Sequence, residues 1–108
     1  MKKDIAFELH KIAIEQGFEF TSRQCIEEMS ELMQALNKLW RHQRTWDEVF
    51  TDSDVEEIEN TLLTNVTEEI ADVLITIENI KYLLSIPDSK INDMIKYKID
   101  RYNINKMH

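Results

Sequence analysis

Two short acidic segments, residues 27–31 and 68–72, contain the side chains of this chain that are best suited to chemistry. The first reads Glu-Glu-Met-Ser-Glu and the second Glu-Glu-Ile-Ala-Asp. In a helix, residues three or four positions apart lie on the same face, so each segment would place carboxylates one turn apart. Two such helices facing each other would form an oxygen-rich site for a hard divalent cation. The sequence therefore indicates a metal site made by two segments that lie far apart along the chain.

The composition favours a single helical domain covering residues 1–108. Of the 108 residues, 43% are hydrophobic, but only one is glycine and one is proline. Nucleotide sites of the Rossmann and P-loop types need glycines where the backbone approaches phosphate, so the composition argues against both. The single cysteine, Cys25, cannot form an internal disulfide, and no apolar run reaches the roughly 18 residues of a membrane span. No secretory signal is evident, so we expect a cytoplasmic protein without a membrane partner.

The charge balance argues against a nucleic-acid partner. The net charge is −8 at pH 7, whereas a nucleic-acid backbone favours basic surfaces. Lys38, Arg41, His42 and Arg44 form a local basic group. We interpret this group as a solvated helix end rather than a nucleic-acid site. An excess of acid also suits a protein whose carboxylates bind cations.

The spacing of apolar residues predicts an all-α subunit, a bundle-like arrangement of four or five helices. Gly17 is expected to end the first helix, as glycine commonly does. Thr21 followed by Gln24 resembles a capping box that would start the second helix, and residues 45–54 are expected to form a loop. The expected helices cover residues 3–16, 21 to 42 or 44, 53 to about 85 (with or without a break near Asn65), and about 91–102.

The helix that contains the second acidic segment is apolar on two sides. A polar line runs between its two apolar strips, with spacings of three, four and three: Glu69, Asp72, Thr76 and Asn79. A helix that is apolar on two sides is expected to be covered on both, which would partly bury these carboxylates. Burying an unpaired carboxylate costs on the order of several kcal/mol. No Lys or Arg lies within a helical turn on this line, so a metal cation is the remaining partner.

Oxygen ligands favour Mg²⁺, with Mn²⁺ as a substitute. Zinc is disfavoured because the chain has only three histidines and no cysteine pair. The absence of a Glu-x-x-His motif argues against a di-iron bundle. Residues 52–56 resemble a calcium loop only faintly, since glycine at the sixth position and glutamate at the twelfth are missing.

The chain contains two acidic motifs in this order, Glu-Glu-x-x-Glu at 27–31 and Glu-x-x-Asp at 69–72. Together they resemble the motifs of the MazG-type family of all-α nucleoside triphosphate pyrophosphohydrolases. The flanking residues agree as well, and the similarity covers roughly residues 20–102. One difference is that thirty-seven residues separate Glu31 from Glu69, somewhat more than is usual for the family. The additional length falls within residues 45–65 and is expected to form an inserted loop and a short helix.

The resemblance implies that the protein hydrolyses a nucleoside triphosphate to the monophosphate and pyrophosphate, in nucleotide-pool housekeeping. An acidic site can bind a triphosphate only through cations, which neutralise the phosphates and stabilise charge at the α-phosphorus. A carboxylate that does not bind metal could orient or deprotonate the attacking water. We also expect a homodimer or homotetramer, because a chain of this length cannot cover apolar strips on two sides of one helix.

The resemblance also assigns residues to roles. The expected metal ligands are Glu28, Glu31, Glu69 and Asp72. The catalytic candidates are Glu27, Glu28 and Glu31, with Glu27 as ligand, supporting residue or base. The substrate-binding candidates are Lys38, Asn79, Lys98 and Arg101. The basic residues also have interpretations other than substrate binding. Lys38 could form an ion pair with Glu31, and Lys98 and Arg101 could form a surface pair at the helix end.

Two other functions stay open from the sequence. The same fold could act on a specialised substrate, such as phosphoribosyl-ATP or a deoxyuridine nucleotide. The chain could also be a non-catalytic helical interaction module, in which the acids only form a solvated surface.

Overall fold

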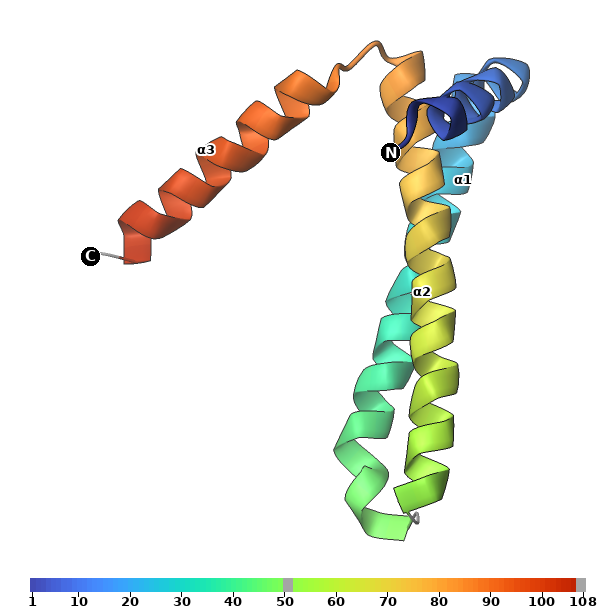
Figure 1. Cartoon of the computed structure of the whole chain (residues 1–108), viewed down its shortest axis with the longest axis vertical. Coiled ribbons are helices and arrows are strands. Elements are labelled where there is room, and N and C mark those ends of the chain that lie inside the picture. Colours follow the sequence, from blue (N-terminus) through green and yellow to red (C-terminus); the bar gives the residue numbers. More distant parts are fainter. Residues whose placement is uncertain (50–51, 107–108) are drawn as a thin grey trace.

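The protein forms a long helical hairpin from which a third helix diverges (Figure 1). The structure, a computed structural model, describes the backbone of residues 1–49 and 52–106 and the side chains of residues 1–43 and 55–106. The helices are α1 (Lys3–Val49), α2 (Asp52–Leu83) and α3 (Asp88–Lys106). The described ranges contain no strand, so the predicted all-α class is confirmed. None of these helices is both long and apolar enough to cross a membrane.

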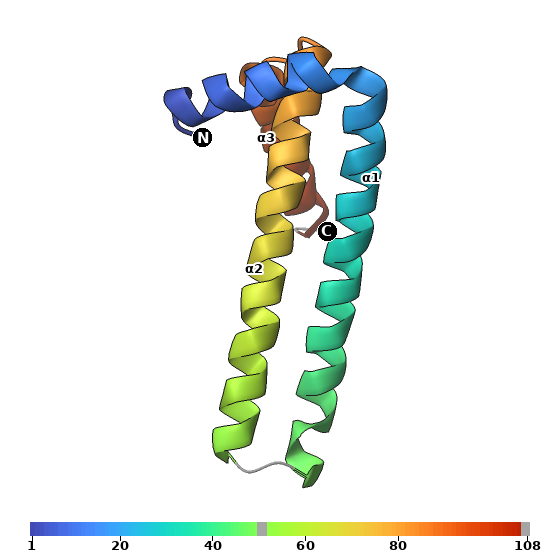
Figure 2. The same ribbon diagram turned by 90° about the vertical axis from the view of Figure 1, so that its right-hand side faces the viewer.

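Gly17 divides α1 into two arms. Its φ of 82° and ψ of 168° are not helical, and they lie in a region that is essentially restricted to glycine. The chain turns here, so that residues 3–16, the N-terminal arm, lie across one end of the hairpin (Figure 2). The predicted end of the first helix at Gly17 is therefore confirmed. The predicted capping box is wrong, because the helix resumes directly after Gly17 and Thr21 is buried with no hydrogen bond to its Oγ1.

The second arm of α1 packs antiparallel against α2 (Figures 1 and 2). Small and β-branched side chains fill this interface: Cys25, Ala35, Val66 and Val73 are all at most 8% exposed. Side chains of this size allow two helices to approach closely over a long distance.

The described residues form three helices, of which α1 consists of two helical segments joined at Gly17, so the predicted count of four or five helices is not confirmed. The expected loop at 45–54 is wrong for most of its length, since α1 extends to Val49 and α2 begins at Asp52; residues 50–51 lie outside the described residues. Nor is there a break near Asn65, because α2 is continuous. Neither stretch contains a glycine or proline to interrupt a helix.

A defined turn ends α2. Ser85 has a φ of 56°, and its N–H donates to the Tyr82 carbonyl at 3.1 Å while the Ile86 N–H donates to the Lys81 carbonyl at 2.9 Å. Together with the left-handed conformation of Ser85, these two bonds form a Schellman cap, which satisfies the last carbonyls of a helix. Pro87 follows, and α3 begins at Asp88.

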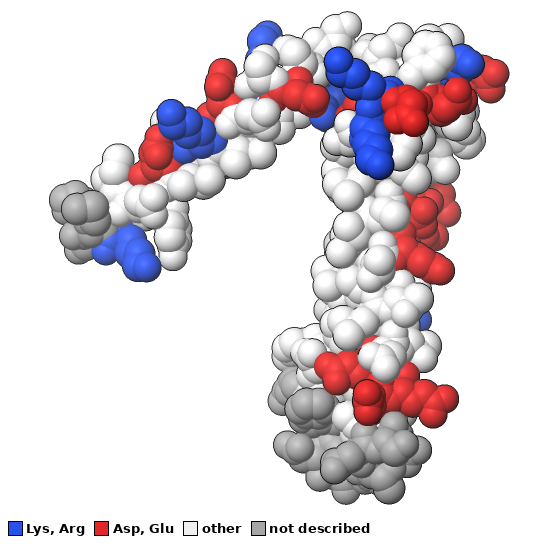
Figure 3. All heavy atoms as spheres, viewed as in Figure 1, with Lys and Arg blue, Asp and Glu red and all other residues white. Residues whose placement is uncertain are grey.

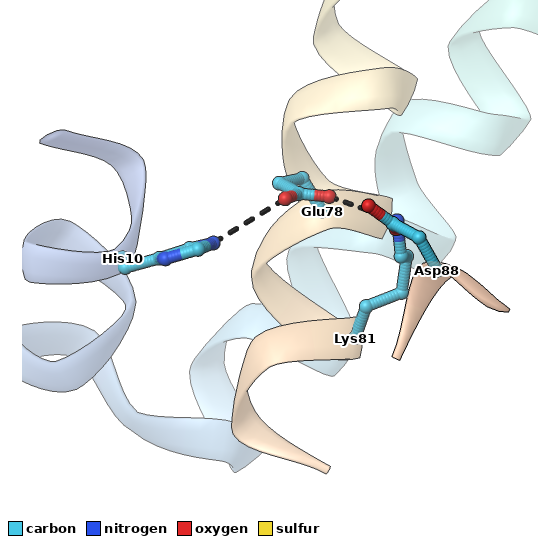
Figure 4. A network of polar contacts seen from close by, with 4 residues as sticks. All are labelled: His10, Glu78, Lys81 and Asp88. Carbon is cyan, nitrogen blue, oxygen red and sulfur yellow. Dashed lines mark hydrogen bonds and ion pairs between the residues drawn. The ribbon is translucent and has the colours of Figure 1, made fainter. Parts of the chain in front are cut away.

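Charged side chains hold this turn in place (Figure 4). Lys81 forms ion pairs with Asp88 of α3 and, at 3.0 Å, with Glu78 of α2. Glu78 in turn lies 3.3 Å from His10 of the N-terminal arm, whose ring stacks on Tyr82 with centroids 4.0 Å apart. The arm, the end of α2 and the start of α3 therefore form one joint.

Gly17 gives the fold its first testable prediction. A Cβ at this position would meet nothing within 4 Å, so the cost of Gly17→Ala comes from backbone strain alone. We expect the free energy of unfolding to fall by about 1–3 kcal/mol in urea titrations. Gln16→Ala, at a helical position next to it, should change stability little. Equal stability of Gly17→Ala and Gln16→Ala would contradict a kink that requires glycine.

Candidate metal centre

Three carboxylates from two helices meet between α1 and α2. Glu28 lies on α1, and Glu69 and Asp72 lie on α2, and each offers an oxygen atom within 4.8 Å of the others. All three side chains are half-buried. The antiparallel pairing of the helices brings the two acidic segments level with each other, although they are far apart in sequence. Three of the four predicted metal ligands are thus brought together.

Glu31 adjoins this group. It lies one turn after Glu28 and is also half-buried, and its carboxyl group helps to raise the pKa of both Glu28 and Glu69. It is not one of the three residues whose oxygens lie within 4.8 Å of one another. We call Glu28, Glu31, Glu69 and Asp72 the acid cluster.

The acid cluster is electrostatically strained. Burial raises the pKa of Glu28 from 4.5 to about 7, aided by its hydrogen bond with Glu31 and by the negative charges of Glu31, Asp72 and Glu69. Burial also raises the pKa of Glu69, together with the charges of Glu31 and Asp72. Among the described residues, no ion pair involves a member of the cluster. Repulsion can therefore be relieved only by a proton or by an added cation.

The orphaned oxygen atoms of the cluster fit a divalent cation. Oε2 of Glu28 and Oε2 of Glu69 are buried without a hydrogen-bond partner. Such an acceptor costs free energy unless something satisfies it. A bound Mg²⁺ or Mn²⁺ would supply the missing partner to an all-oxygen donor set, which is the set that these ions prefer.

A cleft of about 180 Å³ opens beside Glu28 and Asp72. The N-terminal arm forms one wall through Leu9, Ile12 and Gln16, and the hairpin forms the others. Its polar lining consists of Glu28 and Asp72 themselves together with Gln16, Gln24, Thr76 and Asn79. Asn79 is only 3% exposed, and its Oδ1 has no hydrogen-bond partner. Oxygen and amide groups thus line one hollow next to the acids.

Gln16 and Gln24 were missed by the sequence reasoning. Gln16 belongs to no motif and Gln24 was assigned only to the predicted capping box, and the arm covers the hairpin only because of the conformation at Gly17. The glycine was the one available signal of a turn, but its direction could not be derived from the sequence.

The other predicted site residues lie away from the cluster. Glu27 is exposed on α1, and Lys38, exposed farther along the same helix, does not line the cleft. Lys98 and Arg101 are exposed on α3, which has no contact with the hairpin beyond its first turn among the described residues. A single chain does not bring these two cations to the acids, and their role at the phosphates stays a prediction.

Comparisons with protein-family models, curated proteins and solved structures gave no significant match. The assignment of a function therefore depends on the two motifs and on the geometry of the acid cluster.

The raised pKa of Glu28 predicts how the metal-free protein responds to pH. Because the folded state holds this proton more tightly than the unfolded state, its stabilising contribution is complete below about pH 4.5 and is lost as pH rises through 7. In EDTA, wild-type stability should therefore fall between pH 5 and 8. The stability of the Glu28→Gln variant should fall less, and this variant should be more stable than wild type at pH 8, as measured by urea unfolding.

Glu68→Gln is the matched control, since Glu68 is exposed next to the cluster. It should follow the wild-type pH profile. Parallel profiles for wild type and Glu28→Gln would show that the carboxyl group of Glu28 is not perturbed.

Proposed function

We propose that this protein is a Mg²⁺-dependent hydrolase that converts a nucleoside triphosphate to the monophosphate and pyrophosphate, as the resemblance to the MazG-type family implies. The observation that carries the proposal is the convergence of the Glu-Glu-x-x-Glu and Glu-x-x-Asp motifs on one acid cluster. A merely solvated acidic surface does not account for buried carboxylate oxygens without partners. This makes the non-catalytic alternative the weaker one.

In this proposal Glu28, Glu69 and Asp72 hold the metal, with Mn²⁺ as a substitute. The metal would neutralise the phosphates and stabilise the charge that develops during attack on the α-phosphorus. The cluster is suited to this role because it is negatively charged and no side-chain cation pairs with it among the described residues. It therefore attracts divalent ions rather than phosphate.

Glu31 is the residue we assign to the attacking water. Its charge acts on two of the three proposed ligands, Glu28 and Glu69, although it does not belong to their group. Its carboxylate can therefore accept the water proton while the bond from water oxygen to the α-phosphorus forms and pyrophosphate leaves. Glu27 is exposed and has a supporting role at most in this arrangement.

The cleft would hold only part of the substrate. Its volume of about 180 Å³ is below the roughly 300–1,000 Å³ of pockets that enclose a ligand of drug size. The phosphates would lie against the acid cluster, and Asn79, Gln16 and Gln24 offer amide donors and acceptors to the adjoining sugar or base. The remainder of the nucleotide would project beyond the cleft.

The activity is tested with a panel of ordinary and damaged nucleoside triphosphates, phosphoribosyl-ATP and deoxyuridine nucleotides in Mg²⁺. We expect monophosphate and pyrophosphate as products, no activity in EDTA, and restoration by Mg²⁺ or Mn²⁺. Glu28→Gln and Asp72→Asn should each lower kcat/KM at least about 100-fold, since each removes a ligand charge. Glu68→Gln should retain wild-type activity.

Products reveal which part of the proposal fails. Orthophosphate in place of pyrophosphate would contradict attack at the α-phosphorus. Turnover that persists in Glu28→Gln and Asp72→Asn would place the reaction elsewhere on the protein. If no member of the panel is hydrolysed and Mn²⁺ does not bind, the interaction-module alternative would replace the enzyme.

A further inference from the structure

A single copy of this chain exposes far more surface than a compact protein of its mass. Its accessible surface is 8,723 Å², whereas a folded monomer of 12.9 kDa exposes about 6,300 Å². Its radius of gyration is 18.4 Å, against about 13 Å for a compact domain of this length. The excess of about 2,400 Å² is what one partner contributes to a large, permanent dimer interface.

α3 accounts for much of this excess. It contains no buried residue, and the Schellman cap and the Lys81–Asp88 ion pair direct it away from its own hairpin (Figures 1 and 4). Pro87, immediately before the helix, further restricts the connection. The joint therefore leaves α3 without a helix to pack against among the described residues of its own chain.

α3 nevertheless has an apolar stripe. The stripe follows helical spacing and consists of Ile91, Met94, Ile95, Ile99 and Tyr102. The last four are 50–64% exposed. A helix with such a stripe is stabilised mainly by packing against another surface, since its intrinsic propensity contributes little in water.

The hairpin has a matching uncovered surface, the hairpin apolar face. It combines two rows at helical spacing: Ile26, Met29, Met33 and Leu36 on α1, and Leu63, Ile70, Leu74 and Ile77 on α2, all 38–64% exposed. At 100° per residue, both rows fall on the same side of the antiparallel pair, opposite the acid cluster. Figure 3 shows the middle of the hairpin largely uncharged on the side toward α3 and acidic along the opposite edge.

Length and charge match these two surfaces. The α3 stripe spans twelve residues and the α1 row eleven, so each is about 16–18 Å long at 1.5 Å per residue. α3 carries five Lys or Arg against three Asp, a formal charge of +2 in a chain of net −8, so the remainder carries −10. A basic helix and an acidic hairpin on the same chain attract each other across two copies.

We propose that two copies of this chain exchange α3: in a symmetric homodimer, α3 of each copy covers the hairpin apolar face of the other. The occupant of that face is a second copy of this chain, held by the apolar stripe of α3, while the opposite net charges of α3 and the rest of the chain favour the encounter of two copies. Reciprocal exchange buries both uncovered surfaces of each chain at once and forms a closed interface. The dimer does not depend on the proposed catalytic activity, because the hairpin apolar face and the acid cluster lie on opposite sides.

Sedimentation velocity of the full chain at micromolar concentrations tests the exchange. Wild type should sediment as a dimer of twice 12.9 kDa. Ile95→Asp on α3 and Met33→Asp on the hairpin should each weaken the dimer at least tenfold, because each buries a charge in the interface. Asn103→Asp and Gln34→Asp introduce the same side chain away from the stripe and the face, and should remain dimeric.

Circular dichroism separates dissociation from unfolding. Both substituted side chains are at least 50% exposed within one chain, so monomeric variants should keep their helix content. A monomeric wild type overturns the proposal, as does a dimer that Ile95→Asp leaves intact, which would be formed by the hairpins alone.

Discussion

The structure depends on one constraint: four carboxyl groups are held together where α1 meets α2. The packing of small side chains such as Ala35 and Val73 draws the helices close, and this closeness forces Glu28 against Glu69 and Asp72. Apolar packing thus buries these carboxyl groups against electrostatic repulsion, and burial first, then the neighbouring negative charges, raises the pKa values of Glu28 and Glu69. A divalent cation would turn the same crowding into a source of stability, so folding and metal binding are coupled in this account.

The remaining elements of the fold partly cover the acid cluster while leaving a cleft that gives access to it. The turn at Gly17 lays the N-terminal arm over the hairpin, which gives the cleft its third wall and places Gln16 beside the acids. His10 and Glu78 anchor the arm at the same joint that directs α3 outward. The acid cluster and the hairpin apolar face consequently lie on opposite sides of two helices, so that the proposed reaction and the proposed assembly would use different surfaces.

Much of the acid cluster could be predicted from the sequence because its ingredients are local. Helical spacing places Glu69 and Asp72 on one line, and the absence of nearby Lys or Arg identifies them as carboxylates without a partner. Features that depend on tertiary structure were not predictable. The region at 45–54 was expected to be a loop, yet helix continues through most of it. The wall formed by Gln16 depends on the direction of a turn, and the position of Lys98 depends on the direction that the cap at the end of α2 gives to α3.

Anomalous diffraction from crystals grown with Mn²⁺ near pH 7.5 tests the central claim most directly, because it locates the ion without reference to any activity. The account predicts an anomalous peak between the side chains of Glu28, Glu69 and Asp72, at coordination distance from oxygen atoms of all three, and no such peak in crystals of Asp72→Asn. Saturating Mn²⁺ with no peak at the acid cluster, or a peak only at exposed acids elsewhere, would contradict it.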